Sequence, residues 1–228
     1  NTVHITSSGG LTIGNGGVRE AQDKCITIDN FPEGAGFLRV APGATKQMIN
    51  KVKVNYATKA YNSGNPRDEV WQYVGAPGEG MQMSNMDKTL IYHWNEQEGW
   101  VKNSGTSLEP FVGYALTQNQ AQRGEFEILA TPIFENKKIN LTLTPKGMNG
   151  DNLFVNSYLS PIDVARIDPN TDYKDIEGTF YLFNSGSWKN WQADGGADQV
   201  LTGDSPGKYF AITPGSAALI DSNKDQTT

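Results

Sequence analysis

The residues with the clearest spacing for metal chemistry lie in the segment 168–175. Four oxygen-bearing side chains recur there at nearly alternate positions: Asp168, Asn170, Asp172 and Asp175. Calcium loops space carboxylate and amide ligands in this way, but EF-hand loops have a glycine where this segment has Tyr173 and a glutamate where it has Thr179. We therefore keep two interpretations, a calcium site and an ordinary acidic turn, and expect no other cofactor.

A second candidate site is the pair Trp188 and Trp191, which flanks Lys189-Asn190. Aromatic rings that reach the surface can stack on sugar rings, whereas buried aromatic rings fill the core of a β-sandwich. Residues three apart on a strand point to opposite faces, so one tryptophan is expected inside and the other outside. Both interpretations, core packing and glycan binding, stay open for this pair.

The sequence lacks the common catalytic motifs for which we searched. No Gly-x-Ser-x-Gly, His-Glu-x-x-His or phosphate-binding loop occurs. Glu96 and Glu98 form a local acidic pair, which we interpret as solvated turn residues rather than as an acid and base couple. We therefore predict a protein that is not an enzyme.

Composition narrows the class of protein further. The 228 residues include 25 Gly and 11 Pro, which favour turns and strands over long helices. The 19 Lys and Arg residues are outnumbered by 25 Asp and Glu, giving a net charge of -6 that argues against nucleic acid as a partner. No apolar run approaches the roughly 20 residues of a membrane-spanning helix. Cys25 is the single cysteine, so the chain is expected to have no internal disulfide, and we interpret Cys25 as a small buried side chain on a strand.

The first part of the chain has very short apolar segments between glycine-rich bends. The expected strands are 3–6, 11–13, 25–28 and 37–40. Short strands at near-regular spacing are typical of the coils of a β-solenoid or of an edge sheet. Solenoid coils must stack on neighbours to bury their apolar faces. We therefore expect this chain to be part of a longer one.

Longer strands are predicted after residue 50. The segment 51–56 alternates strictly, which places Val52, Val54 and Tyr56 on one face; the segments around Phe126 and at 139–143 alternate as well. One short helix is predicted from Ser160 to Ile167 by a capping serine and a following proline.

Two stretches of the chain share an order of features and predict an internal repeat. Each has a first strand, then an aromatic strand that ends at asparagine, a following tryptophan and a final strand led by proline. The matched residues are Tyr92 with Tyr181, Asn95 with Asn184, Trp100 with Trp188, and Pro110 with Pro214. This order fits two related units of a β-sandwich.

At these residues the chain resembles a β-sandwich region found in large secreted and surface-exposed proteins of the Bacteroidota. The residues that carry the resemblance are Asn152, Leu153, Asn156, Tyr158, Ile162, Asp163, Phe180, Tyr181, Trp188, Pro214 and Gly215, with Gly75-Ala-Pro77 and Pro110–Tyr114 in the companion half. The resemblance covers roughly residues 51–220. The resemblance implies an exported protein of several domains, with type IX secretion as one possible export route. It implies no catalytic residues.

We predict an all-β fold: a duplicated antiparallel β-sandwich, of jelly-roll or immunoglobulin-like topology, preceded by short solenoid-like strands. The expected units are 1–46, 47–147 and 148–228. The expected role is a non-catalytic structural or adhesion module, secreted or displayed at the cell surface. Its expected partners are other domains of a longer parent chain and a surface glycan or protein. The alternative is a carbohydrate-binding module or an accessory domain of a secreted glycan-degrading enzyme.

Overall fold

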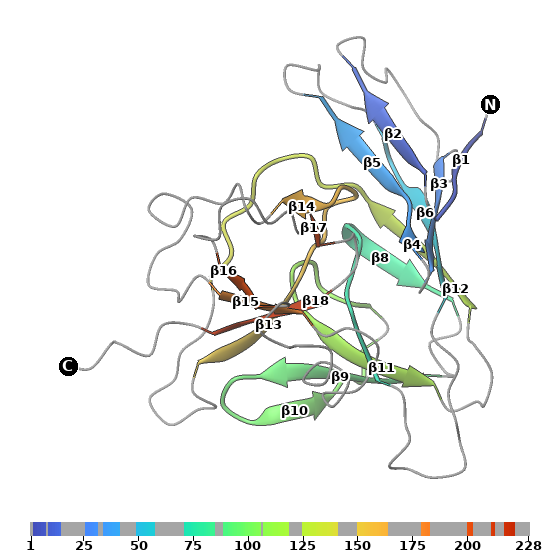
Figure 1. The fold of residues 1–228 in the computed structure, drawn as a ribbon. Coiled ribbons are helices and arrows are strands. Elements are labelled where there is room, and N and C mark those ends of the chain that lie inside the picture. Colours follow the sequence, from blue (N-terminus) through green and yellow to red (C-terminus); the bar gives the residue numbers. More distant parts are fainter. Residues whose placement is uncertain are drawn as a thin grey trace.

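The structure is a computed structural model of the 228-residue chain. It describes residues 2–7, 9–14, 26–31, 34–41, 49–57, 71–84, 89–105, 107–118, 125–140, 150–163, 179–182, 200–202, 211–212 and 217–221. After residue 162 the description covers the backbone of the strands and not their side chains. Every regular element in these ranges is a β-strand, so the predicted all-β class is confirmed (Figure 1). No helix in these ranges has the length and apolar character needed to cross a membrane.

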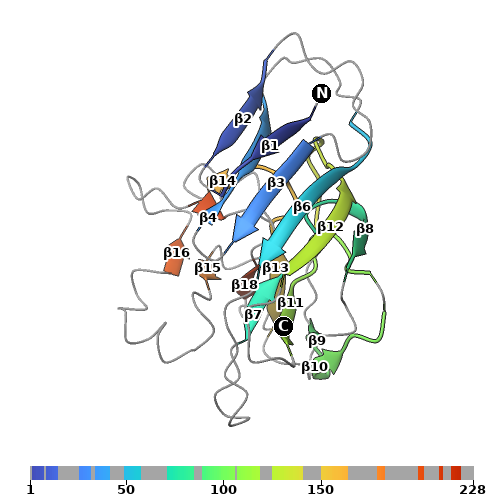
Figure 2. The ribbon, with the colours of Figure 1, turned by 90° about the vertical axis from the view of Figure 1, so that its right-hand side faces the viewer.

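The first sheet has six strands and joins the N-terminal segments to later ones. Its order is β1 (Val3–Ile5), β3 (Ile26–Phe31), β6 (Val52–Ala57), β12 (Glu125–Thr131) and β8 (Glu79–Met83), with β4 (Gly34–Ala35) pairing to β3. Figure 2 shows these strands side by side. The β1–β3 and β3–β6 pairs are parallel, whereas β12 is antiparallel to both β6 and β8. The strands β2 (Gly10–Ile13) and β5 (Phe37–Val40) form a separate parallel pair.

The parallel pairs β1–β3, β3–β6 and β2–β5 join strands that are not consecutive in the chain, as the stacking of solenoid coils does. The strand β3 also pairs with β6, so one sheet continues from residues 26–31 to residues 52–57. The division of the chain into units 1–46, 47–147 and 148–228 stays a prediction.

Two further sheets have four antiparallel strands each. The first has the order β10 (Gly99–Lys102), β9 (Thr89–Asn95), β11 (Tyr114–Gln118) and β7 (Gln72–Val74). The second has the order β13 (Asp151–Val155), β18 (Ala217–Asp221), β15 (Thr179–Leu182) and β16 (Val200–Thr202). When β7 is matched to β13, β9 to β15, β10 to β16 and β11 to β18, the two sheets have the same strand order. The internal repeat predicted from the sequence has this same order of strands, and duplication itself stays a prediction.

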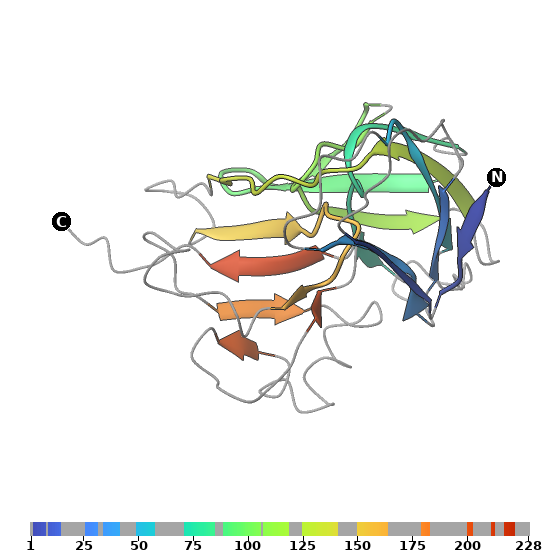
Figure 3. The ribbon, with the colours of Figure 1, turned by 90° about the horizontal axis from the view of Figure 1, so that it is seen from above.

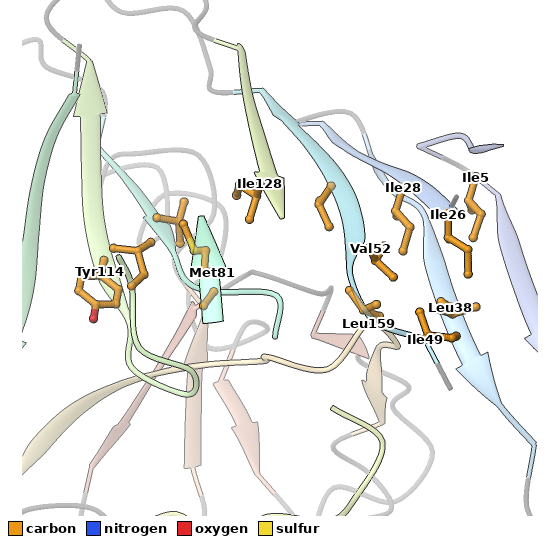
Figure 4. Packing of buried hydrophobic residues seen from close by; sticks show 14 of the residues in the cluster. Ile5, Ile26, Ile28, Leu38, Ile49, Val52, Met81, Tyr114, Ile128 and Leu159 are labelled. Atoms are coloured by element: carbon orange, nitrogen blue, oxygen red, sulfur yellow. The ribbon is translucent and has the colours of Figure 1, made fainter. Parts of the chain in front are cut away.

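The main core lies against the six-stranded sheet and includes side chains from the first four-stranded sheet and from the β2–β5 pair. Alternation places Val52 and Val54 inside, where both are buried, as predicted from the sequence. Their cluster includes Ile28 and Ile128 from the six-stranded sheet and Leu116 from the first four-stranded sheet. Figure 4 shows part of this apolar layer, with Ile26 and Val52 of the six-stranded sheet facing Leu38 of β5, and with Tyr114 of β11 on the side of Met81. Side chains from two sheets that interdigitate in this way define a β-sandwich.

The second four-stranded sheet contacts the first through β13 (Figure 3). The Gly113 N–H donates to the Leu153 carbonyl at 2.9 Å, and Val112 forms an isolated antiparallel bridge with Phe154. A side chain at Gly75 would overlap Val155, because a Cβ there would lie 2.4 Å from Val155 Cγ1. Glycine at position 75 therefore permits the close approach of β13.

Two local predictions were wrong. Ile162 and Asp163, expected in the short helix, form the strand β14 (Ile162–Asp163), which pairs with β17 (Ala211–Ile212). A partner strand some fifty residues later overrides the local helix signal. Ile139 and Asn140, expected in a strand, have no regular structure. The remaining residues of both predicted elements lie outside the described ranges.

Candidate functional site

The site residues predicted from the sequence all lie outside the described ranges. They are Trp188 and Trp191 for glycan binding, and Asp168, Asn170, Asp172 and Asp175 for calcium. Both sites stay predictions. Among the residues whose placement is described, no group of three or more His, Cys, Asp and Glu side chains could hold a metal ion.

The structure instead brings together five aromatic side chains on one face of the first four-stranded sheet, which we call the aromatic layer. Its members are Trp71, Tyr73, Tyr92, Trp94 and Trp100. In antiparallel strands, residues that face each other across a pair share a face of the sheet. Trp94 pairs with Trp100, and Ala115 pairs with both Tyr92 and Tyr73, so these side chains lie on the same side. The opposite face carries Ile91 and Leu116 into the main core.

The rings of the aromatic layer contact one another. The Trp94 and Trp100 ring centroids are 5.2 Å apart with the ring planes 72° to each other, which is an edge-to-face contact. Tyr73 reaches Trp100 at 5.8 Å, and Trp71 meets Tyr92 at 5.6 Å. Such pairs contribute about 0.5–1.5 kcal/mol each beyond the area that they bury. The contacts hold the rings in fixed relative orientations.

Trp94 anchors the aromatic layer to the second four-stranded sheet. Its indole Nε1–H donates to the Asp151 carbonyl at 2.6 Å, and its ring packs with Tyr73 against Leu153 and Val155 of β13. Burial raises the pKa of Tyr73 from 10.0 to about 12, because the phenolate loses hydration inside this contact. One side of the aromatic layer is thus an interior surface.

The other side of the aromatic layer reaches solvent at Trp100. This residue is 42% exposed and lies on β10, which pairs with β9 alone among the described strands. Gln97, Glu98 and Lys102 are exposed nearby in sequence, the first two in the hairpin turn and the third two residues along the strand. Trp100 is therefore an apolar ring with polar neighbours at the edge of a sheet.

Sequence reasoning did not single out the aromatic layer, although part of its signal was present. Alternation in 90–95 places Tyr92 and Trp94 on one face. The hairpin register, which pairs Asn95 with Gly99, was needed to add Trp100 to that face. Tyr73 joins from a strand that is remote in sequence, so no local pattern could have included it.

Buried polar groups near the aromatic layer have structural partners. Glu96, expected to be solvated, is 5% exposed, and its Oε1 accepts the Gly150 N–H at 2.9 Å. Ser157 is fully buried, and its Oγ accepts the Phe111 N–H at 2.7 Å. Asn156, also fully buried, donates from Nδ2 to the Ser160 carbonyl at 2.9 Å. These side chains join turns and loops to one another.

Comparison with known proteins gives one curated relative. The chain is 30% identical over 162 residues to the minor fimbrium subunit Mfa5 of Porphyromonas gingivalis. The match covers 64% of this chain and 13% of that protein, so the chain corresponds to a small part of its relative. The relative comes from the Bacteroidota, the group indicated by the sequence resemblance. No family model and no solved structure matches the chain.

Proposed function

We propose that this chain is a non-catalytic structural or adhesion module of an exported bacterial surface protein. The observation that carries the proposal is the similarity to a fimbrium subunit across 64% of the chain. Because the match covers 13% of that subunit, the parent of this chain is proposed to be longer and to supply the other domains with which this module packs. Display on the outer face of the outer membrane and export by type IX secretion belong to the same proposal.

The structure supports a scaffolding role through the way it uses its buried polar groups. The carboxylate of Glu96 and the hydroxyl of Ser157 each accept a backbone N–H from another segment. Asp29 accepts hydrogen bonds from His4 and Asn55 and so joins three neighbouring strands. Buried polar groups that are satisfied in this way rigidify a fold.

Carbohydrate binding is the second candidate function, and the aromatic layer is the observation that favours it. An accessory domain of a glycan-degrading enzyme would also bind carbohydrate.

The calcium site at 168–175 remains a separate proposal that calcium titration would test.

Surface labelling tests the main proposal. An antibody raised against the 228-residue chain is applied to intact cells that make the parent protein, and fluorescence is compared with that of permeabilised cells. We expect equal labelling in the two samples, with an antibody to a cytoplasmic protein labelling only the permeabilised cells. Labelling that required permeabilisation would contradict the proposal.

A further inference from the structure

We propose that Trp100, held in place by Trp94 and Tyr73, is the stacking surface for a pyranose ring of a glycan. This inference deepens the proposed function, since it names the class of ligand that an adhesion module would hold. The site differs from the pair Trp188 and Trp191 predicted from the sequence. It lies on the hairpin of β9 and β10 in the first four-stranded sheet.

The size of the exposed apolar surface fits one sugar ring. An aromatic side chain contributes at most about 250 Å², so the 42% of Trp100 that is exposed corresponds to about 100 Å². A pyranose has one apolar face of C–H groups and a rim of hydroxyl groups, and a single indole matches that face.

The surroundings of Trp100 fit the hydroxyl rim of such a ring. Lys102 follows on the same face of β10, and its cross-strand partner Tyr92 shares that face. Lys102 is exposed and Tyr92 half-buried, as is expected where polar groups border an apolar contact. Ammonium and phenol groups hydrogen-bond to hydroxyl oxygens.

The site is pre-organised by two aromatic contacts to the partly exposed Trp100 ring. Trp94 meets Trp100 edge to face at 5.2 Å, and Tyr73 lies at 5.8 Å from it. Trp94 is itself fixed by the hydrogen bond from Nε1 to the Asp151 carbonyl. A ring that is already immobilised loses little side-chain entropy when a ligand stacks on it. This distinguishes Trp100 from an isolated exposed aromatic residue.

The experiment applies the 228-residue chain to an array of immobilised oligosaccharides built from hexoses, N-acetylhexosamines and uronic or sialic acids. The array contains both neutral and acidic sugars, so it separates these sources of the same ring chemistry. We expect binding to a subset of these sugars. Trp100→Ala is expected to reduce the signal at least ten-fold, whereas Trp100→Phe keeps part of it.

Phe134→Ala is the matched control, because Phe134 is 38% exposed and lies outside the aromatic layer. It is expected to bind as the wild type does. Should Trp100→Ala fail to fold, titration of the wild type with a bound oligosaccharide, followed by NMR, gives a second readout: the Trp100 indole N–H resonance must shift.

Two results would overturn the proposal. One is an array on which the wild type binds no sugar, and the other is binding by folded Trp100→Ala equal to that of the wild type. Neither result alters the surface labelling of intact cells, so failure of the glycan site and failure of the proposed function are distinguishable.

Discussion

Glu96 ties the β9–β10 hairpin to the start of β13. It follows the last residue of β9, and its carboxylate accepts the N–H of Gly150, the residue before β13. The strands β9 and β13 belong to different sheets, and this hydrogen bond at 2.9 Å joins them next to the one from Trp94 to the Asp151 carbonyl. Asn95 fixes the hairpin turn, because its Oδ1 accepts the N–H groups of Gln97 and Glu98. Glu96 is thereby directed inward while Glu98 stays exposed.

Replacing Glu96 by alanine should therefore destabilise the protein. The buried Gly150 N–H loses this acceptor, which costs about 1–3 kcal/mol of unfolding free energy. Urea unfolding measures the change. Glu98→Ala is the control, since an exposed substitution is expected to stay within about 0.5 kcal/mol. Equal stability of the two variants would contradict the role given to Glu96.

Tyr73 predicts an alkaline dependence of stability. Its pKa is raised from 10.0 to about 12 in the folded protein, so the folded state holds the phenol proton more tightly than the unfolded chain does. The contribution of Tyr73 is complete below about pH 10 and is lost as the pH rises toward 12. Burial also raises the pKa of Tyr56 and Tyr114, which therefore add to the loss in the same direction.

The measurement is the urea midpoint of the wild type and of Tyr73→Phe at intervals from pH 8 to pH 12. Tyr73→Phe should lose stability less steeply above pH 10, because it has no phenol to ionise at this position. Parallel curves for the two proteins would show that Tyr73 does not titrate with the expected shift.

At the scale of elements, Asp29 joins three strands of the six-stranded sheet. It lies on β3 and is 7% exposed. His4 Nε2 on β1 donates to its Oδ2 at 2.9 Å, and Asn55 Nδ2 on β6 donates to its Oδ1 at 2.9 Å. These side-chain hydrogen bonds connect the same neighbouring strands that the backbone hydrogen bonds pair. They reinforce the pairing of the short parallel strand β1.

Asp29→Ala should weaken this end of the sheet first. Hydrogen bonds to a charged group contribute about 1.5–3 kcal/mol, so global stability should fall by about that amount. Amide exchange in β1 should accelerate more than in β11, which belongs to another sheet. Thr12→Ala, an exposed change on β2, should leave both unaffected. An amide-exchange rate in β1 that is the same in Asp29→Ala as in the wild type would contradict the proposed role of Asp29 in holding β1.

Most strands of the described ranges could be predicted from local patterns, because apolar alternation marks the buried face directly. The segment 51–56 shows this, since β6 covers it with Val52 and Val54 buried. The helix expected at Ile162 failed because strand pairing with Ile212 is a non-local interaction that capping signals do not report. Phe111 is a related case. Pro110 predicts a turn at this position. The turn gives Phe111 a φ of 65°, a conformation usually adopted by glycine, and the sequence does not indicate this.

The aromatic layer could be predicted only in part. Tyr92 and Trp94 share a face by simple alternation, but contact with Tyr73 depends on which strands become neighbours. Strand order in a sheet is set by the packing of the whole molecule rather than by local sequence. The same limit applies to Glu96, whose burial follows from the position of Gly150.

At the scale of the whole molecule, the two four-stranded sheets are held together where β13 crosses Gly75 and Gly113. A Cβ at either glycine would meet the side chains of Val155 or Leu153 at 2.4 Å. The approach of the two sheets therefore requires glycine at these positions. It also brings Trp94 within hydrogen-bond distance of the Asp151 carbonyl.

Gly75→Ala should destabilise the whole protein, since a methyl group there forces β13 away. Overpacking of this kind costs about 1–3 kcal/mol, and calorimetry should show one transition at a lower midpoint. Gly14→Ala is the matched control, because no atom lies within 4 Å of the added Cβ and the backbone conformation suits alanine. A melting temperature of Gly75→Ala equal to that of the wild type would contradict the close packing of Val155 against Gly75.

The central claim, that this chain is a structural or adhesion module of a surface protein, is tested most directly by deleting it from the parent protein. Cells making the parent with and without these 228 residues are compared for surface fibres by electron microscopy and for adherence to protein- or glycan-coated surfaces. The account predicts loss of fibre incorporation, of adherence, or of both, at equal amounts of parent protein. Unchanged fibres together with unchanged adherence would contradict it.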